Sequence, residues 1–351
     1  MLQSAWQVFW LIGAQPCLTQ EVDNMKAGIV GLGNFGTAIG NLIAGNGYDV
    51  LGWDHNQDVV DEINQVHLNQ RYLPGVELDA SLSASDELSQ LFSRCDVIFI
   101  AVPSVYIRPT LEPFQDQVAG HVLLVNLAKG IELETGVTAF QRVGCLFPEN
   151  PRVVLSGPSI ANEFSRKMPT TVVIASQDHN NLLTVSKLLD NGYFRTRFSR
   201  DTIGVELGGI LKNIYAIGLG LFDGKEITSV NFRSVYLTIA LEEMARIGVG
   251  MGAQVDTFLY LSGMGDLLAT SMSEHSHNRQ MGIYLAQGLT QAEIKMRMGV
   301  FPEGYSTIQA ILYIAEKLHV SMPLAKGLWD VINNRYDADK FISLFIRDFV
   351  E

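Results

Sequence analysis

The chain has 351 residues, 47% of them hydrophobic, and a formal net charge of -12 at pH 7. Because this length is about twice that of a typical domain, we expect two domains with sizeable cores. The negative charge argues against nucleic acid or an anionic membrane surface as the main partner. The cysteines Cys17, Cys95 and Cys145 lack metal-ligand spacing, and such a sparse, odd set suggests reduced thiols in a cytoplasmic protein.

The first 24 residues differ from the remainder of the chain. Residues 6–14 form an apolar run that no lysine or arginine precedes, and the run is too short to span a bilayer. We interpret residues 1–24 as a disordered or loosely docked extension, or as an upstream start with Met25 beginning the fold. A degenerate signal peptide is the alternative. No membrane span is expected after Met25.

A glycine-rich turn follows the first predicted strand. Residues 26–30, apolar after Lys26, form a short predicted strand that leads into Gly31, Gly33 and Gly36, which form the pattern G-x-G-x-x-G before a predicted helix at 38–46. These glycines allow a tight turn, close approach of a pyrophosphate, and packing of the helix on the strand. The phosphates then lie at the positive end of that helix. With its strand and helix in place, the pattern predicts a dinucleotide-binding site.

Asp54 ends the second predicted strand, residues 49–53. It lies about 20 residues past the glycines, where a carboxylate can accept hydrogen bonds from an adenosine ribose. Since this charge would repel a 2′-phosphate, NAD is favoured over NADP. The alternative is that Asp54 caps the helix that starts near Gln57.

Further apolar runs predict a mostly parallel sheet covered on both faces, with strands at 96–103, 122–127, 153–156 and 171–175. Polar or glycine-containing motifs follow several of them, at 102–104, 128–130 and 156–159. The carboxyl edge of such a sheet is where ligands bind. Lys129 is therefore a candidate for contacting a substrate anion or carbonyl, or alternatively it neutralises a strand end.

Beyond residue 198 the strand pattern gives way to helical patterns. Helices are predicted at 204–221, 234–246, 254–261, 278–286, 291–297, 307–318 and 324–334. We therefore predict a first domain at 25–198 and an all-helical second domain at 199–351, with the boundary between 193 and 201. The apolar helices of the second domain also suggest a homodimer, although a buried core explains them equally well.

One lysine lies inside the most apolar of these helices. Around Lys212, residues 206–218 are almost entirely apolar, and small Gly208, Gly209 and Gly218 allow another backbone to approach closely. A lysine is seldom buried without a partner, and desolvation lowers its pKa toward neutral pH, where it can donate and accept protons. The alternative is a lysine whose ammonium reaches water from the helix edge.

Two polar features follow in the second domain. Asp266 stands in the otherwise apolar turn 263–267, and Ser276, His277, Asn278 and Arg279 open a helix. A helix amino terminus with such residues is a candidate anion site. Alternatively, it is a surface cap with solvated charges.

Taken together, the motifs resemble those of NAD(P)-dependent glycerol-3-phosphate dehydrogenases from about residue 25 to 334. The matching stretches are 31–38, 71–76, 128–132, 156–159, 211–213, 264–267 and 303–304. The resemblance implies a Rossmann-type domain followed by a helical domain like that of 6-phosphogluconate dehydrogenase. It also implies hydride transfer between NADH and dihydroxyacetone phosphate, a phosphorylated small molecule, without a metal. Lys212 would then be the general acid and base, with Lys129 and Asp266 as catalytic neighbours.

The resemblance also implies two sets of binding residues. The cofactor set is Gly31, Gly33, Asn34, Phe35, Gly36, Asp54, Pro103, Lys129, Ala161, Asn278 and Glu303. The substrate set is Lys129, Gly157, Ser159, Lys212, Asn213, Asp266, Thr270, His277, Asn278 and Arg279.

One departure from the family pattern concerns the phosphate. His277 stands where the family usually has an arginine, which would bind a phosphate through two hydrogen bonds. We hypothesise weaker phosphate recognition, served by Arg279 or by a protonated His277. The alternatives are a paralogue related to 3-hydroxyacid or 6-phosphogluconate dehydrogenases with a different substrate, and a catalytically silent NAD sensor.

Overall fold

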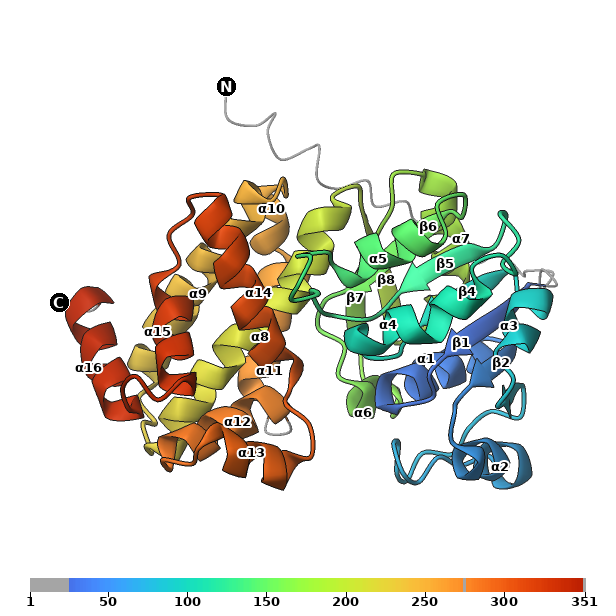
Figure 1. The fold of residues 1–351 in the computed structure, drawn as a ribbon. Helices are drawn as coiled ribbons and strands as arrows, with labels where there is room; N and C mark the ends of the chain where they lie inside the picture. Colours follow the sequence, from blue (N-terminus) through green and yellow to red (C-terminus); the bar gives the residue numbers. More distant parts are fainter. Residues whose placement is uncertain (1–24, 274–275, 350–351) are drawn as a thin grey trace.

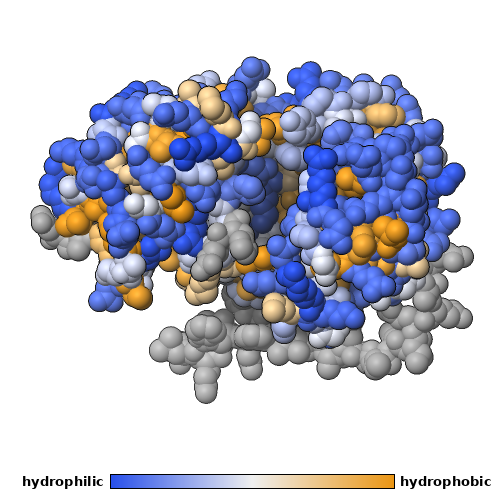
Figure 2. All heavy atoms as spheres, turned by 90° about the horizontal axis from the view of Figure 1, so that it is seen from below, coloured by the Kyte–Doolittle hydropathy of each residue, from blue (hydrophilic) through white to orange (hydrophobic). Residues whose placement is uncertain are grey.

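The computed structural model describes residues 25–273 and 276–349. The prediction for residues 1–24 lies outside this range. In Figure 1 the chain forms two lobes side by side, one built on a sheet and one from helices alone. Seen from below in Figure 2, the surface is hollowed between the two lobes.

The first lobe contains an eight-stranded sheet in the order β3-β2-β1-β4-β5-β6-β7-β8. Its strands are β1 Lys26–Val30, β2 Asp49–Trp53, β3 Leu82–Ser85, β4 Val97–Ile100, β5 Leu123–Asn126, β6 Arg152–Ser156, β7 Thr170–Ala175 and β8 Phe194–Ser199. All neighbours pair in parallel except β6 and β7, which are antiparallel. The mostly parallel sheet is confirmed. Strands β3 and β8 were not predicted, and the strand expected at 96–103 is shorter.

Helices cover both faces of this sheet, as Figure 1 shows. They are α1 Asn34–Gly45, α2 Gln57–Val66, α3 Ser89–Arg94, α4 Ser104–Leu111 with a 3₁₀ turn Glu112–Phe114, α5 Ala139–Leu146, α6 Ala161–Phe164 and α7 His179–Leu189. Within β4, Val97 and Phe99 pack in the core under α1 and α7. Ile98 and Ile100 belong to the core under α3, α4 and α5. Both faces of the strand are therefore apolar, which explains its continuous apolar sequence.

The second lobe consists of helices. They are α8 Thr202–Gly224, α9 Val230–Gly250, α10 Val255–Phe258, the π-helix η2 Leu261–Gly265, α11 Asp266–Met272, α12 His277–Ala286, α13 Gln291–Met298, α14 Glu303–Lys317, α15 Pro323–Ile332 and α16 Ala338–Phe349. The helix predicted at 254–261 is wrong in extent, because the chain leaves the α conformation after Phe258 and forms the π turn. Helix α14 begins four residues earlier than predicted, and α16 was not predicted.

Helix α8 is the centre of the second lobe. Its apolar residues lie in one core with those of α9, α12, α14 and α15. Within the described part of the chain, α8 is the one helix long and apolar enough to cross a membrane, but 94% of that stretch is buried inside the protein. It is therefore a core helix by burial.

The junction between the lobes is short and fixed by one carboxylate. Strand β8 ends at Ser199, and α8 begins at Thr202. Between them, Asp201 caps α8 by accepting a hydrogen bond of 2.8 Å from the Gly204 amide. Its other oxygen accepts from the Gln254 amide and the Thr257 hydroxyl. This tie holds the start of α8 against the start of α10.

Candidate active site

A single buried carboxylate binds two lysines at the junction of the lobes. The Lys212 ammonium donates to Asp266 Oδ1 over 2.5 Å, and the Lys129 ammonium donates to Asp266 Oδ2 over 2.9 Å. Only 2% of the Asp266 side chain is exposed, compared with 13% for Lys212 and 21% for Lys129. The three charges therefore form a compact cluster of net charge +1, largely removed from water.

Each member of this cluster comes from a different element. Lys212 lies in the middle of α8, Lys129 follows β5 at the carboxyl edge of the sheet, and Asp266 is the first residue of α11. The π-helix η2 precedes Asp266, and such turns often occur at functional sites. The structure thus brings together the three catalytic residues expected from the sequence, which are far apart along the chain.

Burial makes Lys212 a weaker base than an ordinary lysine. It lowers the pKa of Lys212 to about 8, although the Asp266 carboxylate acts in the opposite direction. The positive charge of Lys129 adds to the lowering. An amine with this pKa exchanges a proton readily near neutral pH, as a general acid and base must. The alternative, an ammonium that reaches solvent from the helix edge, is not what the structure shows.

Thr270 and Glu303 complete the surroundings of this ammonium. The Lys212 ammonium also donates to Thr270 Oγ1 over 2.8 Å, one turn after Asp266 on α11. Glu303 opens α14, and burial raises its pKa to about 7 while the nearby charges of Lys129 and Lys212 lower it. Both residues thus lie near the Lys212 ammonium, and the binding roles that the resemblance implies for them stay predictions.

Two asparagines lie beside the lysine on α8. The Asn278 amide donates to Asn213 Oδ1 over 3.1 Å, and Asn278 Oδ1 accepts from the Gly304 backbone amide over 2.9 Å. Asn213 follows Lys212 directly. Helices α8, α12 and α14 are therefore held together by these amides next to the lysine cluster.

The glycine turn is shaped for a dinucleotide phosphate. Gly31 has φ +101°, which favours glycine, and a Cβ on Gly36 would lie 2.0 Å from the Gly31 carbonyl oxygen. A Cβ on Gly33 would meet nothing within 4 Å, so open space lies there. No side chain caps the amino terminus of α1. Its first backbone amides can therefore donate hydrogen bonds to an anion.

Asp54 lies at the carboxyl end of β2 and faces this turn. Its carboxylate accepts hydrogen bonds from the backbone amides of Leu32 and Asn56, over 3.2 and 2.9 Å. The residue that caps α2 is Asn56, whose side chain accepts from the Asp58 amide. The alternative that Asp54 caps this helix is therefore wrong.

The other predicted binding residues gather at the same edge of the sheet. Pro103 precedes α4 after β4, and Ala161 begins α6. Between β6 and α6, Gly157 has φ +116°, and the Ser159 hydroxyl donates to its carbonyl oxygen over 3.0 Å. Phe35, in the first turn of α1, makes an edge contact with the ring of Phe164.

The sequence reasoning missed two contacts of Asn34. Its amide donates to the Tyr72 carbonyl oxygen over 2.7 Å and to Asn162 Oδ1 over 3.1 Å. Asn34 thus ties the glycine turn to two distant loops. Tyr72 lay in a matching stretch, but nothing in the sequence indicated that its backbone would meet the turn.

The comparisons with known proteins agree with this geometry. Residues 26–182 match the model of the NAD-dependent glycerol-3-phosphate dehydrogenase N-terminus, and residues 201–343 match that of its C-terminus. The chain belongs to the NAD-dependent glycerol-3-phosphate dehydrogenase family.

Relatives of similar length support the assignment to this family. The chain is 37% identical to glycerol-3-phosphate dehydrogenase [NAD(P)+] of Staphylococcus carnosus, over 92% of this chain and 97% of that protein. It is 36% identical to the same enzyme of Geobacter sulfurreducens over equal shares. The crystal structure of glycerol-3-phosphate dehydrogenase from Coxiella burnetii superposes with a TM-score of 0.86 at 28% identity, covering 92% of this chain and 99% of that one.

The structure places Arg279 away from the lysine cluster, although the sequence made it a candidate for binding the substrate phosphate. The Arg279 guanidinium donates to Asp223 Oδ2 over 2.8 and 2.6 Å, and to the carbonyl oxygens of Ser271 and Ser273. Asp223 lies near the end of α8, about 16 Å along the helix axis from Lys212. The guanidinium thus binds a second carboxylate and the end of α11.

His277, by contrast, is exposed. It is the first residue of α12, directly after the capping residue Ser276. Of the two side chains predicted to bind the phosphate, His277 and Arg279, His277 is the one without a hydrogen-bond or ion-pair partner among residues 25–273 and 276–349.

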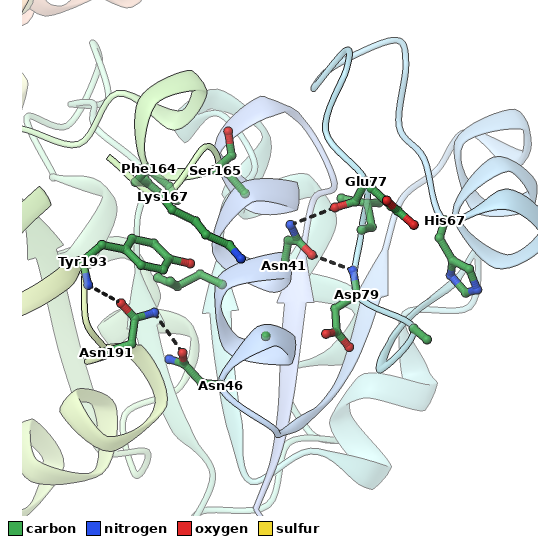
Figure 3. A pocket seen from close by; sticks show the side chains of 15 residues that line it. Asn41, Asn46, His67, Glu77, Asp79, Phe164, Ser165, Lys167, Asn191 and Tyr193 are labelled. Carbon is green, nitrogen blue, oxygen red and sulfur yellow. Dashed lines mark hydrogen bonds between the residues drawn. The ribbon is translucent and has the colours of Figure 1, made fainter. Parts of the chain in front are cut away.

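A surface hollow lies away from this cluster. A cavity of about 690 Å³ opens over α1, between the loops at 77–80 and 164–167. Figure 3 shows that Asn41 bonds to the backbone of Glu77 and Asp79, while Asn191 bonds to Asn46. None of the predicted site residues lines this cavity. Its amides hold loops of the first lobe together.

Within the described residues, no group of three or more His, Cys, Asp or Glu side chains is arranged to hold a metal ion.

Proposed function

We propose that this protein interconverts dihydroxyacetone phosphate and sn-glycerol 3-phosphate with NAD(H), using Lys212 as general acid and base. The observation that carries the proposal is the buried Lys212 ammonium, bound to Asp266 beside Lys129 at the junction of the lobes. Family membership supports the reaction type. The geometry supports the assignment of roles.

The glycine turn fits the cofactor. The open space at Gly33 and the uncapped α1 amino terminus would hold the pyrophosphate, and Asp54 would lie beside the adenosine ribose. The Asp54 carboxylate already faces the turn through the Leu32 amide. When bound, the reduced nicotinamide supplies the hydride. NAD is proposed rather than NADP, because Asp54 would repel a 2′-phosphate.

The lysine pair supplies the electrostatic and proton-transfer parts of the reaction. Reduction of a ketone develops negative charge on its oxygen, and an adjacent ammonium stabilises that charge. Lys212 then donates its proton to the oxygen in reduction and accepts it in oxidation. Asp266 orients the ammonium through a 2.5 Å hydrogen bond and leaves a third donor position for the substrate.

Substrate orientation is proposed for the neighbouring polar groups. Thr270 accepts a hydrogen bond from the Lys212 ammonium, and beside it the Asn278 amide donates a hydrogen bond to Asn213. We assign the phosphate to the exposed amino terminus of α12 around His277, since Arg279 is engaged with Asp223. A histidine gives fewer hydrogen bonds to a phosphate than an arginine, so weaker phosphate binding is expected.

The test is NADH oxidation by the purified protein with dihydroxyacetone phosphate, compared with a panel of 3-keto acids and other small keto phosphates. The proposal expects turnover with dihydroxyacetone phosphate that exceeds every other compound in kcat/KM. A preference for a keto acid would favour the related hydroxyacid dehydrogenase. Binding of NADH without turnover of any compound would favour the sensor.

A further inference from the structure

The side chain of Lys129 passes close to the α8 backbone on its way to Asp266, and this course is called the passage below. A Cβ placed on Gly209 of α8 would lie 3.2 and 3.3 Å from Cε and Cδ of Lys129. The same point lies 2.3 Å from Ser156 Oγ, at the end of β6. The aliphatic part of Lys129 and the Ser156 hydroxyl therefore both lie against the α8 backbone at Gly209, where space for a further carbon is absent.

The start of this passage is also fixed. Asn126, the last residue of β5, donates from its side-chain amide to the Ala128 carbonyl oxygen over 3.0 Å, directly before Lys129. The end of the passage is Asp266 Oδ2. Both ends of the lysine are thus held, and between them its carbons lie close to the Cβ position of Gly209, which the Ser156 hydroxyl also borders.

Ser156 is buried at the end of β6. It is 1% exposed, and its hydroxyl has no hydrogen-bond partner among the residues that the structure describes. A buried hydroxyl without a partner lowers stability. Such a group calls for an explanation, and its position against the Cβ site of Gly209 supplies one.

Gly209 also lies on the same face of α8 as Lys212. Residues three apart on a helix are neighbours on its surface. The passage therefore opens beside the Lys212 ammonium, and the two lysines meet the two oxygens of one carboxylate.

We propose that Gly209 and Ser156 are positioning residues that lead the Lys129 ammonium to Asp266, beside Lys212. The inference rests on the proposed function and adds two residues that do not touch substrate. The charge of Lys129 lowers the pKa of Lys212. Displacement of Lys129 would therefore raise the pKa of Lys212 as well as slow the reaction.

The test uses Gly209→Ala, Ser156→Ala and the double variant in the full-length protein. Gly209→Ala should lower kcat for dihydroxyacetone phosphate reduction about 10- to 100-fold, since displacement by about 1 Å can have such an effect. The high-pH decline of kcat/KM should also move to higher pH, and the NADH dissociation constant should stay within about threefold of native. Ser156→Ala alone should lower kcat about threefold.

The double variant is the decisive arm. It removes the atom at 2.3 Å and leaves only the Lys129 carbons at 3.2 and 3.3 Å, which can shift slightly. It should recover most of the kcat lost in Gly209→Ala, and the high-pH decline of kcat/KM should return to its native position. Gly45→Ala, at the end of α1 where a Cβ meets nothing within 4 Å, is the matched control for a glycine-to-alanine change and should behave as native.

The outcomes separate cleanly. The proposal is overturned if Gly209→Ala keeps the native kcat and the native high-pH decline of kcat/KM. It is also overturned if the double variant has no higher kcat than Gly209→Ala. A Gly209→Ala protein that does not fold supports the contact if the double variant folds, and if neither folds the close approach is purely structural and the proposal is rejected. Absence of turnover in the native protein would overturn the proposed function instead.

Discussion

Two carboxylates next to α8 each bind two cations, about 16 Å apart along the helix. At one, Asp266 binds Lys129 and Lys212. At the other, Asp223 on α8 binds Arg233 and Arg279. Both clusters have a net charge of +1 and are largely shielded from water.

The difference lies in the cations. Arginine keeps its proton at all ordinary pH values, and its planar donors suit it to fixed contacts. Accordingly, Arg279 also binds carbonyl oxygens at the end of α11, and Arg233 binds the Ile227 carbonyl oxygen. Lysine changes its pKa when buried, and that of Lys212 falls to about 8. The two clusters have the same net charge, but the arginine cluster is a structural tie and the lysine cluster is suited to the proton transfer that we propose.

The comparison predicts opposite results for one substitution made in each cluster. Lys212→Met should lower kcat for dihydroxyacetone phosphate reduction about 10³-fold, because general acid catalysis is lost. Arg279→Met should leave kcat within about threefold, because it removes a contact remote from the chemistry. Steady-state NADH oxidation measures both. Similar large losses in the two variants would mean that the clusters act as one site.

Breaking the second cluster should affect stability instead. Asp223→Asn would leave Arg233 and Arg279 without their carboxylate, and partly buried cations without partners are costly. The free energy of unfolding should fall by about 2–3 kcal/mol, less than for fully buried pairs. Urea denaturation measures this change. An unchanged midpoint would show that the arginines are satisfied by solvent and the carbonyl oxygens.

A guanidinium placed at the first residue of α12 sharpens the comparison. His277→Arg should lower KM for dihydroxyacetone phosphate about 10-fold, since it restores two hydrogen bonds to a phosphate, with little change in kcat. The dissociation constant of NADH serves as the control and should stay constant. If KM is unchanged, the phosphate does not lie at the amino terminus of α12.

The smallest effect is expected at a third acid, Glu206, which has no ion-pair partner within the described part of the chain. Glu206 is buried on α8, accepts a 2.7 Å hydrogen bond from the Phe140 amide, and has its pKa raised to about 7 by burial. A raised pKa means that its stabilising contribution is present at low pH and is lost as pH rises through about 7. Glu206→Gln should therefore be more stable than native at pH 8, relative to pH 5, by about 1 kcal/mol. Denaturation at the two pH values measures the difference, and equal effects would contradict the raised pKa.

Much of the fold could be predicted from local patterns. The G-x-G-x-x-G turn and the continuous apolar runs of β1, β4, β5 and β7 carry their own signal, because both faces of each strand are buried. Strand β8 alternates buried Phe194 and Thr196 with exposed Arg195 and Arg197 at the sheet edge, so its charged residues obscured it. The π turn before Asp266 was missed because it depends on the close approach of the α8 backbone. A Cβ on Gly208 would lie 2.3 Å from the Ser262 carbonyl oxygen.

The place of the two lysines in the site could be predicted from the sequence, whereas the partner of Arg279 could not. Lys212 stands out in an apolar helix, and Lys129 and Asp266 follow from their motifs. The partner of Arg279 lies 56 residues away along the chain, and spacing alone did not connect the two. The same holds for Gly209, whose closeness to Ser156 and Lys129 exists only once β6 packs against α8.

The central claim is that the Lys212 ammonium gives and takes the proton, and its pKa of about 8 allows a direct test. The measurement is kcat/KM from about pH 7 to 10 in both directions, for the native protein with NADH and with NAD. Reduction should decline about tenfold per pH unit above 8, where the lysine loses its proton, and oxidation should rise up to the same pH and then level off. Profiles that are flat across this range, or that change in the same direction, would contradict the account.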